Sequence, residues 1–323
     1  MGSNGGDIRR VIPTPCPGSN AALLDAFHHH LTDRDLAPST VQAYLSDLAC
    51  FQAWLTWVHE DKAPLLLQVR TVDLAAFRTH LIHEQGHPPA TVNRRLQGLR
   101  LLFRLLVERN WMAENPTTHL RFMRKSGTPQ PLALRRREVF ALLHAAAASP
   151  HGLALRNGAL VQLMLQAGLR VGEVTALTHR DIQLHRRSGT VHVRDGKGRQ
   201  ARDIPLNETA RRAVQAYLDP RSDLSAYTPV FLSKHGTLLA VRSAKAVVAQ
   251  LAVQAGIRRI PVSAHTLQHT FAVHYLQQHP GKLRELADLL GHASVDTTAL
   301  YTKPSRDDVA ADLERSPLNV FRL

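Results

Sequence analysis

The residues best suited to chemistry lie late in the sequence, where Tyr301 follows His292 by nine residues. Tyrosine hydroxyls can act as nucleophiles, and histidines can carry protons or donate hydrogen bonds. Leucines at helical spacing precede the pair, Gly291 ends the predicted helix, and Asp296 and Thr297 can cap a second short helix that carries Tyr301. A single tyrosine on an amphipathic helix is more often a packing residue, so the pair gains meaning only from the other motifs.

A second motif, GLRVGE over residues 168–173, places an arginine at a predicted helix start. An apolar helix is expected over 153–167 and is broken by Gly168, after which a new helix begins at Arg170. A guanidinium at this point would lie where a helix N-terminus already favours an anion. Glu173 is interpreted as a structural partner for nearby backbone or arginine groups rather than as a catalyst.

Two further motifs supply a lysine and a histidine. The sequence GKG at 196–198 forms the turn between two predicted strands, so Lys197 lies at the tip of a hairpin and can reach outward. The sequence HTLQHTFA at 265–272 opens a predicted helix. On this helix His265 and Gln268 are three residues apart and are expected to face the same way.

The composition indicates a protein that binds nucleic acid. The chain has 323 residues, 44% of them hydrophobic, which suffices for two domains with cores of their own. Its formal net charge is +14, and only seven of its 40 basic residues are lysines. The excess is therefore arginine, whose planar guanidinium pairs well with phosphate. The alternative is a solvated basic surface with no such partner.

The cysteines and histidines argue against several other classes. Cys16 and Cys50 lie far apart with no CxxC, which disfavours a disulfide framework and a zinc ribbon. His265 and His269 have a metal-like i,i+4 spacing, but no third ligand follows in a suitable context. No apolar run approaches a membrane span, and the first residues lack the apolar core of a signal peptide. We expect a cytoplasmic protein with no membrane partner, no metal and no cofactor.

The predicted elements divide the chain into two domains. Residues 1–19 form a Pro- and Gly-bearing arm, and 20–118 form a helical domain. Residues 119–131 are basic and without periodicity, as in an extended linker. Residues 132–305 combine helices with a few strands, and 306–323 form a short tail that must dock on something. The expected fold is mainly α with a small β-sheet, an α+β domain preceded by a helical one.

Basic and amide side chains gather on one helix and on the linker. The helix expected over 91–108 has an apolar face and an opposite polar stripe suited to a DNA groove, although a solvated helix face is the alternative. The linker can follow a phosphate backbone, so the two domains together are expected to form a clamp on DNA. The predicted DNA-contact residues are Asn93, Arg94, Gln97, Arg100 and Arg104 on the helix, with Arg121, Arg124 and Lys125 in the linker.

Taken in order, the motifs resemble the tyrosine recombinase (phage integrase) family, with Xer-like or transposon-borne recombinases as the closest type. Residues 20–118 also resemble the helical core-binding domain of that family, so the resemblance covers nearly the whole chain. The matching stretches are GLR-x-x-E at 168–173, GKG at 196–198, HTLQHTFA at 265–272, LLGH at 289–292 and Tyr301.

The resemblance implies site-specific DNA cleavage and rejoining without a metal or cofactor. Tyr301 would attack a DNA phosphodiester, giving a 3′-phosphotyrosine and a free 5′-hydroxyl. Arg170 would clamp the non-bridging oxygens, and Lys197 would protonate the leaving 5′-oxygen. His265 would act as a general base or phosphate ligand, and His292 would hydrogen-bond the phosphate.

One residue departs from the family pattern H-x-x-R, because Gln268 stands where a second clamping arginine is expected. Its amide can donate a hydrogen bond but carries no charge, and losing one such contact usually costs about 10²–10³ in rate. Gln268 is either an engineered substitution or a natural variant, or a basic neighbour such as His269 substitutes for the missing charge. The predicted catalytic set is Arg170, Lys197, His265, Gln268, His292 and Tyr301.

Two other functions stay open. Gln268 motivates a catalytically silent DNA-binding protein on a recombinase fold, against which Tyr301 and Lys197 argue. A topoisomerase-like enzyme would use the same chemistry without site choice, but the separate helical domain and the tail favour assembly on specific sites. The resemblance further implies double-stranded DNA with inverted-repeat half-sites, a dimer on each site, and a tetramer in synapsis held by residues 306–323 docking in trans.

Overall fold

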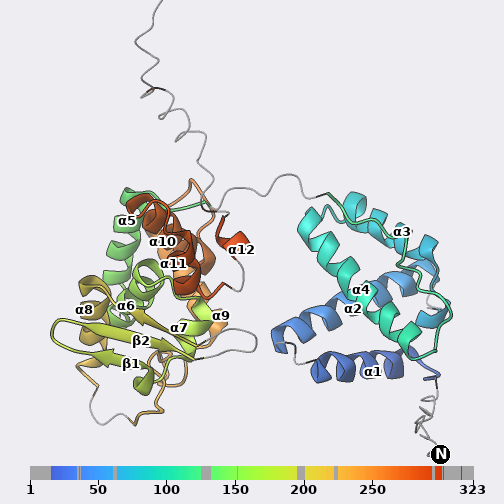
Figure 1. The fold of residues 1–323 in the computed structure, drawn as a ribbon, viewed down its shortest axis with the longest axis horizontal. Helices are drawn as coiled ribbons and strands as arrows, with labels where there is room; N and C mark the ends of the chain where they lie inside the picture. The colour runs from blue at the N-terminus through green and yellow to red at the C-terminus, as the bar shows by residue number, and fades with distance from the viewer. Residues whose placement is uncertain are drawn as a thin grey trace, which may run out of the picture. The chain divides into compact units, whose positions relative to one another are not determined.

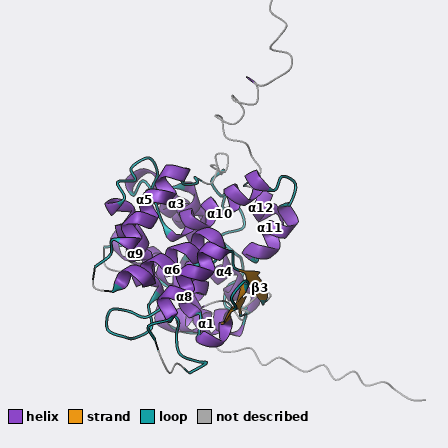
Figure 2. Ribbon diagram, turned by 90° about the vertical axis from the view of Figure 1, so that its left-hand side faces the viewer, coloured by secondary structure: helices purple, strands orange, loops and turns teal. Residues whose placement is uncertain are grey.

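The computed structural model describes residues 16–34, 36, 38–60, 64–124, 132–150, 152–194, 201–221, 225–292, 295–299, 301 and 314. The chain divides into two compact units, Met1–Gly127 and Thr128–Leu323, and each is described here by itself (Figure 1). Most of the chain is helical (Figure 2). In the described part of the chain, strands occur only in the second unit (Figure 1). The predicted fold class, mainly α with a small sheet, is confirmed.

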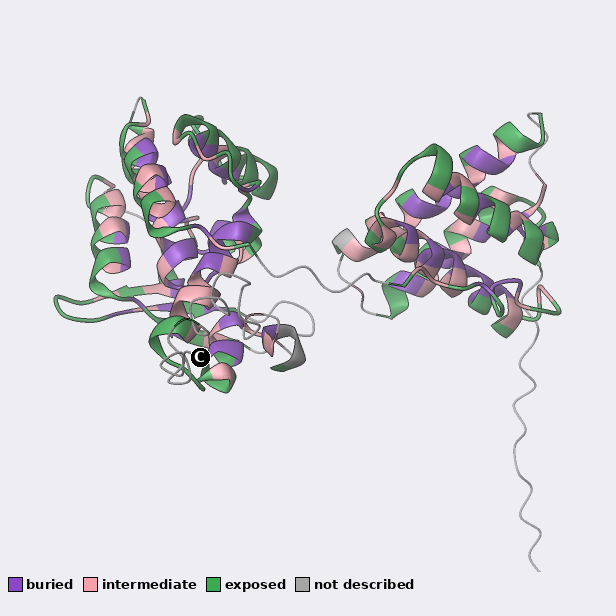
Figure 3. Ribbon diagram, turned by 90° about the horizontal axis from the view of Figure 1, so that it is seen from above, coloured by how far each residue is buried: buried purple, intermediate pink, exposed green. Residues whose placement is uncertain are grey.

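The N-terminal unit is a set of packed helices: α1 (Asn20–Asp33), α2 (Pro38–Val58), η1 (Leu66–Gln68), α3 (Thr71–Thr79), η2 (His80–Glu84) and α4 (Pro89–Glu108). The helix predicted over 91–108 is α4, and its apolar positions Val92, Leu96 and Leu99 are fully buried. Buried residues lie on the inward sides of the helices (Figure 3). Helical spacing in the sequence therefore identified the core-facing side of α4 correctly.

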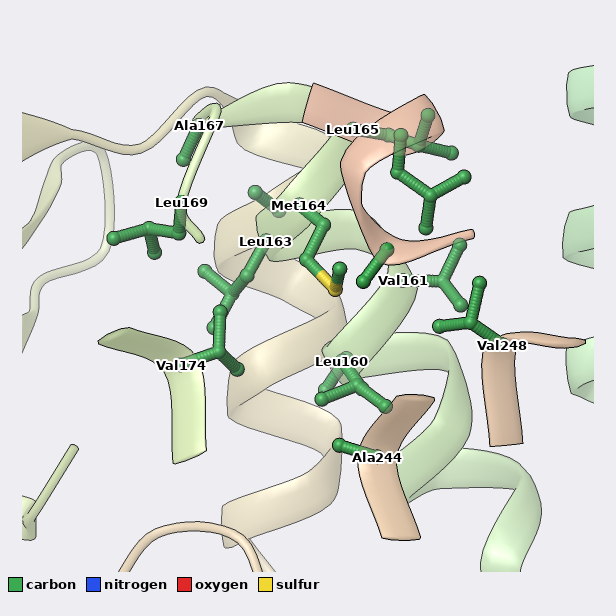
Figure 4. Close-up of a cluster of buried hydrophobic side chains, with 14 of the residues drawn as sticks. Leu160, Val161, Leu163, Met164, Leu165, Ala167, Leu169, Val174, Ala244 and Val248 are labelled. Carbon is green, nitrogen blue, oxygen red and sulfur yellow. The ribbon is translucent and has the colours of Figure 1, made fainter. Parts of the chain in front are cut away.

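The C-terminal unit follows an αβα order: α5 (Arg136–Ala147), α6 (Leu153–Gln166), α7 (Val171–Ala176), η3 (His179–Asp181), β1 (Ile182–Leu184), β2 (Gly189–Val193), β3 (Arg202–Pro205), α8 (Glu208–Leu218), α9 (Val241–Gln254), α10 (Ala264–Gln278), α11 (Leu283–Leu290) and α12 (Val295–Ala299). Helix α6 packs against α5, α7, α8 and α10. Its buried side chains, among them Leu160, Leu163 and Met164, form the centre of the core, with Val174 from α7 and Val248 from α9 (Figure 4). The apolar helix predicted over 153–167 is thus the one around which the unit is built.

The sheet is antiparallel in the order β1-β2-β3. Val191 in the central strand pairs with Ile182 on one side and Ile204 on the other. The sequence predicts β2 and β3 but not β1, because three residues after a 3₁₀ turn are too few to show alternation. The tip of the predicted hairpin, with Lys197, lies outside the described residues.

The prediction for α12 is wrong in two respects. Helix α12 begins at Val295, so Asp296 and Thr297 lie inside it rather than capping it. Tyr301 lies beyond the end of α12, in a turn where its N–H donates to the carbonyl of Thr298 at 3.0 Å. The physical reason is that Thr298, the fourth residue of this short helix, is fully buried and its hydroxyl lies 2.8 Å from His292 Nδ1, which ties the helix to the turn before it.

Candidate active site

One side of the site is formed by a glutamate that binds two arginines. Arg170 precedes α7 with extended backbone, as expected for a residue at a helix start. Its N–H donates to Glu173 Oε2 at 2.8 Å and its Nη1 donates to Oε1 at 3.0 Å. Arg202 on β3 donates to the same carboxylate through Nη1 at 3.2 Å and Nη2 at 3.1 Å. Glu173 is therefore the structural partner that the sequence predicts, and it fixes both guanidinium groups.

The charge state of Glu173 follows from these contacts. Burial alone would raise the pKa of its carboxyl, but the hydrogen bonds from Arg202 and from the Arg170 backbone, with the two guanidinium charges, hold the pKa below its usual value. Arg202 was not among the residues predicted from the sequence. Since it lies two residues before the buried Ile204 on the same strand, alternation would have placed it on the inward face.

The turn after α11 lies against these arginines. Gly291 ends α11 with a φ of 60°, and a Cβ there would lie 2.7 Å from Arg202 Nη1. Arg202 Nε donates to the carbonyl of Leu289 at 2.8 Å, and Arg170 Nη2 approaches the carbonyl of Gly291 at 3.5 Å. The glycine thus provides both the left-handed backbone and the space for the guanidinium.

His292 follows directly on this turn, so it lies next to Arg170 in space. Its Nδ1 is 2.8 Å from the Thr298 hydroxyl, which fixes the plane of the imidazole. Helix α12 packs against α11. This packing accounts for the short spacing in sequence between LLGH and Tyr301.

Tyr301 and two histidines of α10 make the other side of the site. The side chain of Ser263 caps α10 by accepting from the N–H of Thr266, so His265 stands in the first turn. The rings of His265 and His269 stack with their centroids 5.7 Å apart. His269 Nδ1 is 2.7 Å from the Tyr301 hydroxyl oxygen, a contact that the sequence analysis did not predict.

Arg170 is close enough to these groups to affect their charge. Burial lowers the pKa of His265, and the charges of Arg170 and Lys245 lower it further. Burial raises the pKa of Tyr301, and Arg170 acts in the opposite direction. An arginine near a histidine and a phenol can stabilise negative charge that develops between them.

Gln268 is 3% exposed and does not share the outward face of His265. Its Nε2 donates to the carbonyl of Gly168 at 2.9 Å. An α-helix has 3.6 residues per turn, so residue 268 falls just short of a full turn from His265 and residue 269 falls just past it. Seen along the helix axis, the two side chains therefore point to opposite sides of the direction of His265. In α10 the side of Gln268 faces the core, and His269 lies beside His265. The predicted shared face is therefore wrong for Gln268.

The predicted DNA-contact residues all belong to the N-terminal unit. Asn93 pairs with the backbone of Met123 through both amide atoms, at 2.9 and 2.8 Å. Arg100 donates to the carbonyl of Leu120 at 3.1 Å, and its guanidinium lies 4.2 Å from the centre of the Phe122 ring. These two residues hold the segment 120–123 against α4.

The remaining predicted DNA-contact residues differ in their contacts and exposure. Arg94 forms an ion pair with Asp47, which is 3% exposed. Gln97 is partly buried, and Arg104 is exposed on α4. Arg121 and Arg124 are exposed as well, whereas Lys125 lies outside the described residues.

The described residues contain no cluster of three or more His, Cys, Asp or Glu side chains that could hold a metal ion. The helices in the described part of the chain include none long and apolar enough to cross a membrane.

Comparison with known proteins gives a consistent result. The sequence profile of the phage integrase family matches residues 133–307, and that of the phage integrase N-terminal SAM-like domain matches residues 23–113. The chain is 31% identical to tyrosine recombinase XerD of Listeria monocytogenes over 88% of this chain and 94% of the relative. It is 34% identical to tyrosine recombinase XerC of Xanthomonas campestris over 92% and 89%.

Solved structures resemble the fold at lower identity. A XerH site-specific recombinase bound to a palindromic difH substrate gives a TM-score of 0.70 at 22% identity, covering 91% of this chain and 84% of that one. A lambda integrase dimer bound to a COC' core site gives a TM-score of 0.69 at 19% identity, covering 88% and 77%.

Proposed function

Because the chain belongs to the phage integrase family and is a tyrosine-type DNA recombinase, we propose that it cleaves and rejoins DNA at specific sites through a 3′-phosphotyrosine intermediate. The relatives over most of its length are XerC and XerD tyrosine recombinases, and similar solved structures are recombinases bound to DNA. A net charge of +14 supports double-stranded DNA as the partner.

The observation that carries this proposal is the convergence of groups from four separate motifs. The charge of Arg170, from the 168–173 motif, acts on Tyr301 and on His265 of α10, and its guanidinium approaches the carbonyl of Gly291, the residue before His292. A phosphodiester attacked in line by a phenol needs a nucleophile and positive or hydrogen-bonding groups around the non-bridging oxygens. This set of side chains supplies both.

Each residue then has a role in the transfer. Tyr301 attacks the phosphorus, and Arg170 clamps the non-bridging oxygens with a guanidinium already fixed by Glu173. His292 donates a hydrogen bond to the phosphate, and His265 acts on the phosphate or as a general base. Lys197, outside the described residues, protonates the leaving 5′-oxygen.

Gln268 makes this enzyme a slowed recombinase in our proposal. Its amide is bonded to Gly168 inside the domain, and a neutral amide cannot supply the charge of a second clamping arginine. One missing charge-assisted contact corresponds to about 10²–10³ in rate.

The larger assembly is also part of the proposal. The helical domain 20–118 and the catalytic domain 132–305, joined by 119–131, form a clamp on DNA, with two protomers on inverted half-sites and four in synapsis. Residues 306–323 dock in trans on a neighbouring protomer. An enzyme with this substrate would act in the cytoplasm.

A nicked suicide duplex tests the proposal, because loss of the short fragment next to the nick traps the covalent adduct. The protein should form a protein–DNA adduct on its own site, and Tyr301→Phe should form none while binding with unchanged affinity. Binding without an adduct, even after long incubation, would indicate a silent DNA-binding protein. Adducts of equal yield on unrelated duplexes would indicate a topoisomerase-like enzyme.

A further inference from the structure

The hydroxyl of Tyr301 has a specific partner on α10. His269 Nδ1 lies 2.7 Å from the hydroxyl oxygen, which is a short hydrogen bond between a phenol and an imidazole. The two ring centroids are 5.4 Å apart, and both side chains are partly buried. His265, by contrast, meets His269 through a stacked ring rather than through the Tyr301 oxygen. His269 therefore touches the reacting atom itself.

The surroundings of this pair keep both members uncharged at neutral pH. Burial lowers the pKa of His269, and the neighbouring His265 lowers it further. Burial raises the pKa of Tyr301. The charged groups facing this region are Arg170, from the start of α7, and Lys245 on α9, both of which act on His265. A neutral imidazole beside a protonated phenol is a hydrogen-bond acceptor in the right place to receive its proton.

We propose that His269 is the general base of the cleavage step, accepting the Tyr301 proton at Nδ1 while the Tyr301 oxygen attacks phosphorus. This inference rests on the recombinase function proposed above. The Tyr301 oxygen forms a bond to phosphorus, and the bond from phosphorus to the 5′-oxygen breaks. The Tyr301 proton moves to His269 Nδ1, and the leaving oxygen takes a proton from Lys197. On rejoining, the 5′-hydroxyl gives its proton to Lys197 as its oxygen attacks phosphorus, the bond from phosphorus to the Tyr301 oxygen breaks, and His269 returns its proton to the tyrosine.

This assignment gives His265 and His269, whose rings stack, two different roles. His265 is exposed and lies near Arg170, so it is available to the phosphate. His269 is one turn further along α10 and is partly buried against Tyr301. From the sequence, His269 was a candidate substitute for a missing arginine and one half of a metal-like pair with His265, whereas the geometry gives it a separate role.

The test measures the single-turnover rate of adduct formation on the nicked site for substitutions at 269. His269→Asn places a carbonyl oxygen close to the Nδ1 position, so it can accept the hydrogen bond but cannot take the proton. We expect His269→Asn and His269→Ala to slow adduct formation by about 10²–10³ without changing DNA affinity. His274→Ala is the matched control, since His274 is another partly buried histidine of α10 whose pKa is lowered by burial, and it should react nearly normally.

Two further readouts separate a proton acceptor from a structural residue. With Tyr301 replaced by a fluorinated tyrosine whose phenol is more acidic, the His269→Ala protein should regain much of its lost rate, because the nucleophile ionises without help. The rate of the unmodified protein should level off above the pKa of His269, while that of His269→Asn should keep rising with pH toward the raised pKa of Tyr301.

The outcomes are distinct. An adduct from the unchanged protein together with a normal rate for His269→Asn would overturn the inference and leave the recombinase function intact. A slow His269→Ala protein that the fluorinated tyrosine does not rescue would also overturn it, because the histidine would then only support structure. No adduct from the unchanged protein on any site would count against the proposed function instead.

Discussion

The side-chain amide of Gln268 donates a 2.9 Å hydrogen bond to the carbonyl oxygen of Gly168, two residues before Arg170. Gly168 has a φ of 65°, and a Cβ there would lie 2.4 Å from Phe271 Cδ1, so the 168–170 turn packs directly on α10. The amide thus ties α10 to the turn that delivers Arg170. Gln268 therefore has a structural role, which a comparison of the sequence with the H-x-x-R pattern does not reveal.

We predict that Gln268→Arg raises the rate of adduct formation by about 10²–10³, some 3–4 kcal/mol of barrier. In arginine the Nε is bonded to Cδ, as Nε2 is in glutamine, so it can keep the hydrogen bond to Gly168. The rest of the guanidinium would extend past that point, beside the turn that carries Arg170. Adduct yield over time on a nicked site measures the effect.

Site affinity should change little in this variant, because one phosphate contact among many is restored. Gln268→Lys is the control: it adds a charge but has no planar fork, so it should gain less. An unchanged rate for Gln268→Arg would mean that the native site already holds the phosphate fully, and the slowed-enzyme proposal would be wrong.

The sequence allowed most of the helices to be predicted, because each has a long apolar face of its own. The buried stripe of α4, with Val92, Leu96 and Leu99, needs only its own period to be recognised. Strand β1 could not be found this way, since it is three residues long and becomes a strand only by pairing with β2. Its structure depends on a partner rather than on its own pattern.

In the candidate site, too, local patterns could be predicted and contacts between distant segments could not. Arg170, His265, His292 and Tyr301 were identifiable because they lie in short motifs with fixed spacing. The contact between His269 and Tyr301 joins residues 32 apart, and which histidine of α10 meets the tyrosine depends on how the helix is rotated. The exposed face of α4 was the least predictable part, because a polar residue there can contact DNA or its own chain, as Asn93 does.

Glu173→Gln should destabilise the catalytic domain by about 3–5 kcal/mol at neutral pH, because two guanidinium groups would lose their shared carboxylate inside the protein. The pKa of Glu173 is lowered in the folded state, so its contribution is fully present above the unfolded value and is lost as pH falls through the folded one. The difference between the two proteins should therefore begin to shrink as pH falls below the unfolded value of about 4.3, and it should vanish only below the lowered folded pKa.

Chemical denaturation over a pH series measures this prediction. Asp203→Asn is the matched control, since Asp203 is exposed and pairs with His192 on the neighbouring strand. It should cost less than about 1 kcal/mol. A pH-independent difference between Glu173→Gln and the unchanged protein would show that the loss comes from packing and not from charge.

Truncation after Arg306 should leave binding to a single site nearly intact and reduce synapsis. Residues 306–323 lie outside the described residues apart from Glu314. Their apolar residues cannot bury themselves in so short a segment: Val309, Leu313, Leu318, Val320 and Phe321. We expect the tail to bury these apolar side chains by docking in trans on a neighbouring protomer. Sizing of protein–DNA complexes would show bound single sites without four-protomer assemblies, whereas normal synapsis by the truncated protein would rule out this role.

The last prediction concerns the polar stripe of α4, whose members we expect to act in two different ways. Asn93 uses both amide atoms on the backbone of Met123, so Asn93→Ala should lower the stability of the N-terminal domain by about 1–3 kcal/mol. Arg104 is exposed on the same helix, so Arg104→Ala should leave stability unchanged and weaken DNA binding. The slope of log affinity against log salt should fall by about 1 for Arg104→Ala, because one phosphate contact is lost. Salt titrations and thermal unfolding of both variants measure the two effects. If Arg104→Ala bound DNA with the original slope while Asn93→Ala lost slope and kept its stability, the assignment of the two residues would be reversed, and the segment around Met123 would have to leave α4 when DNA binds.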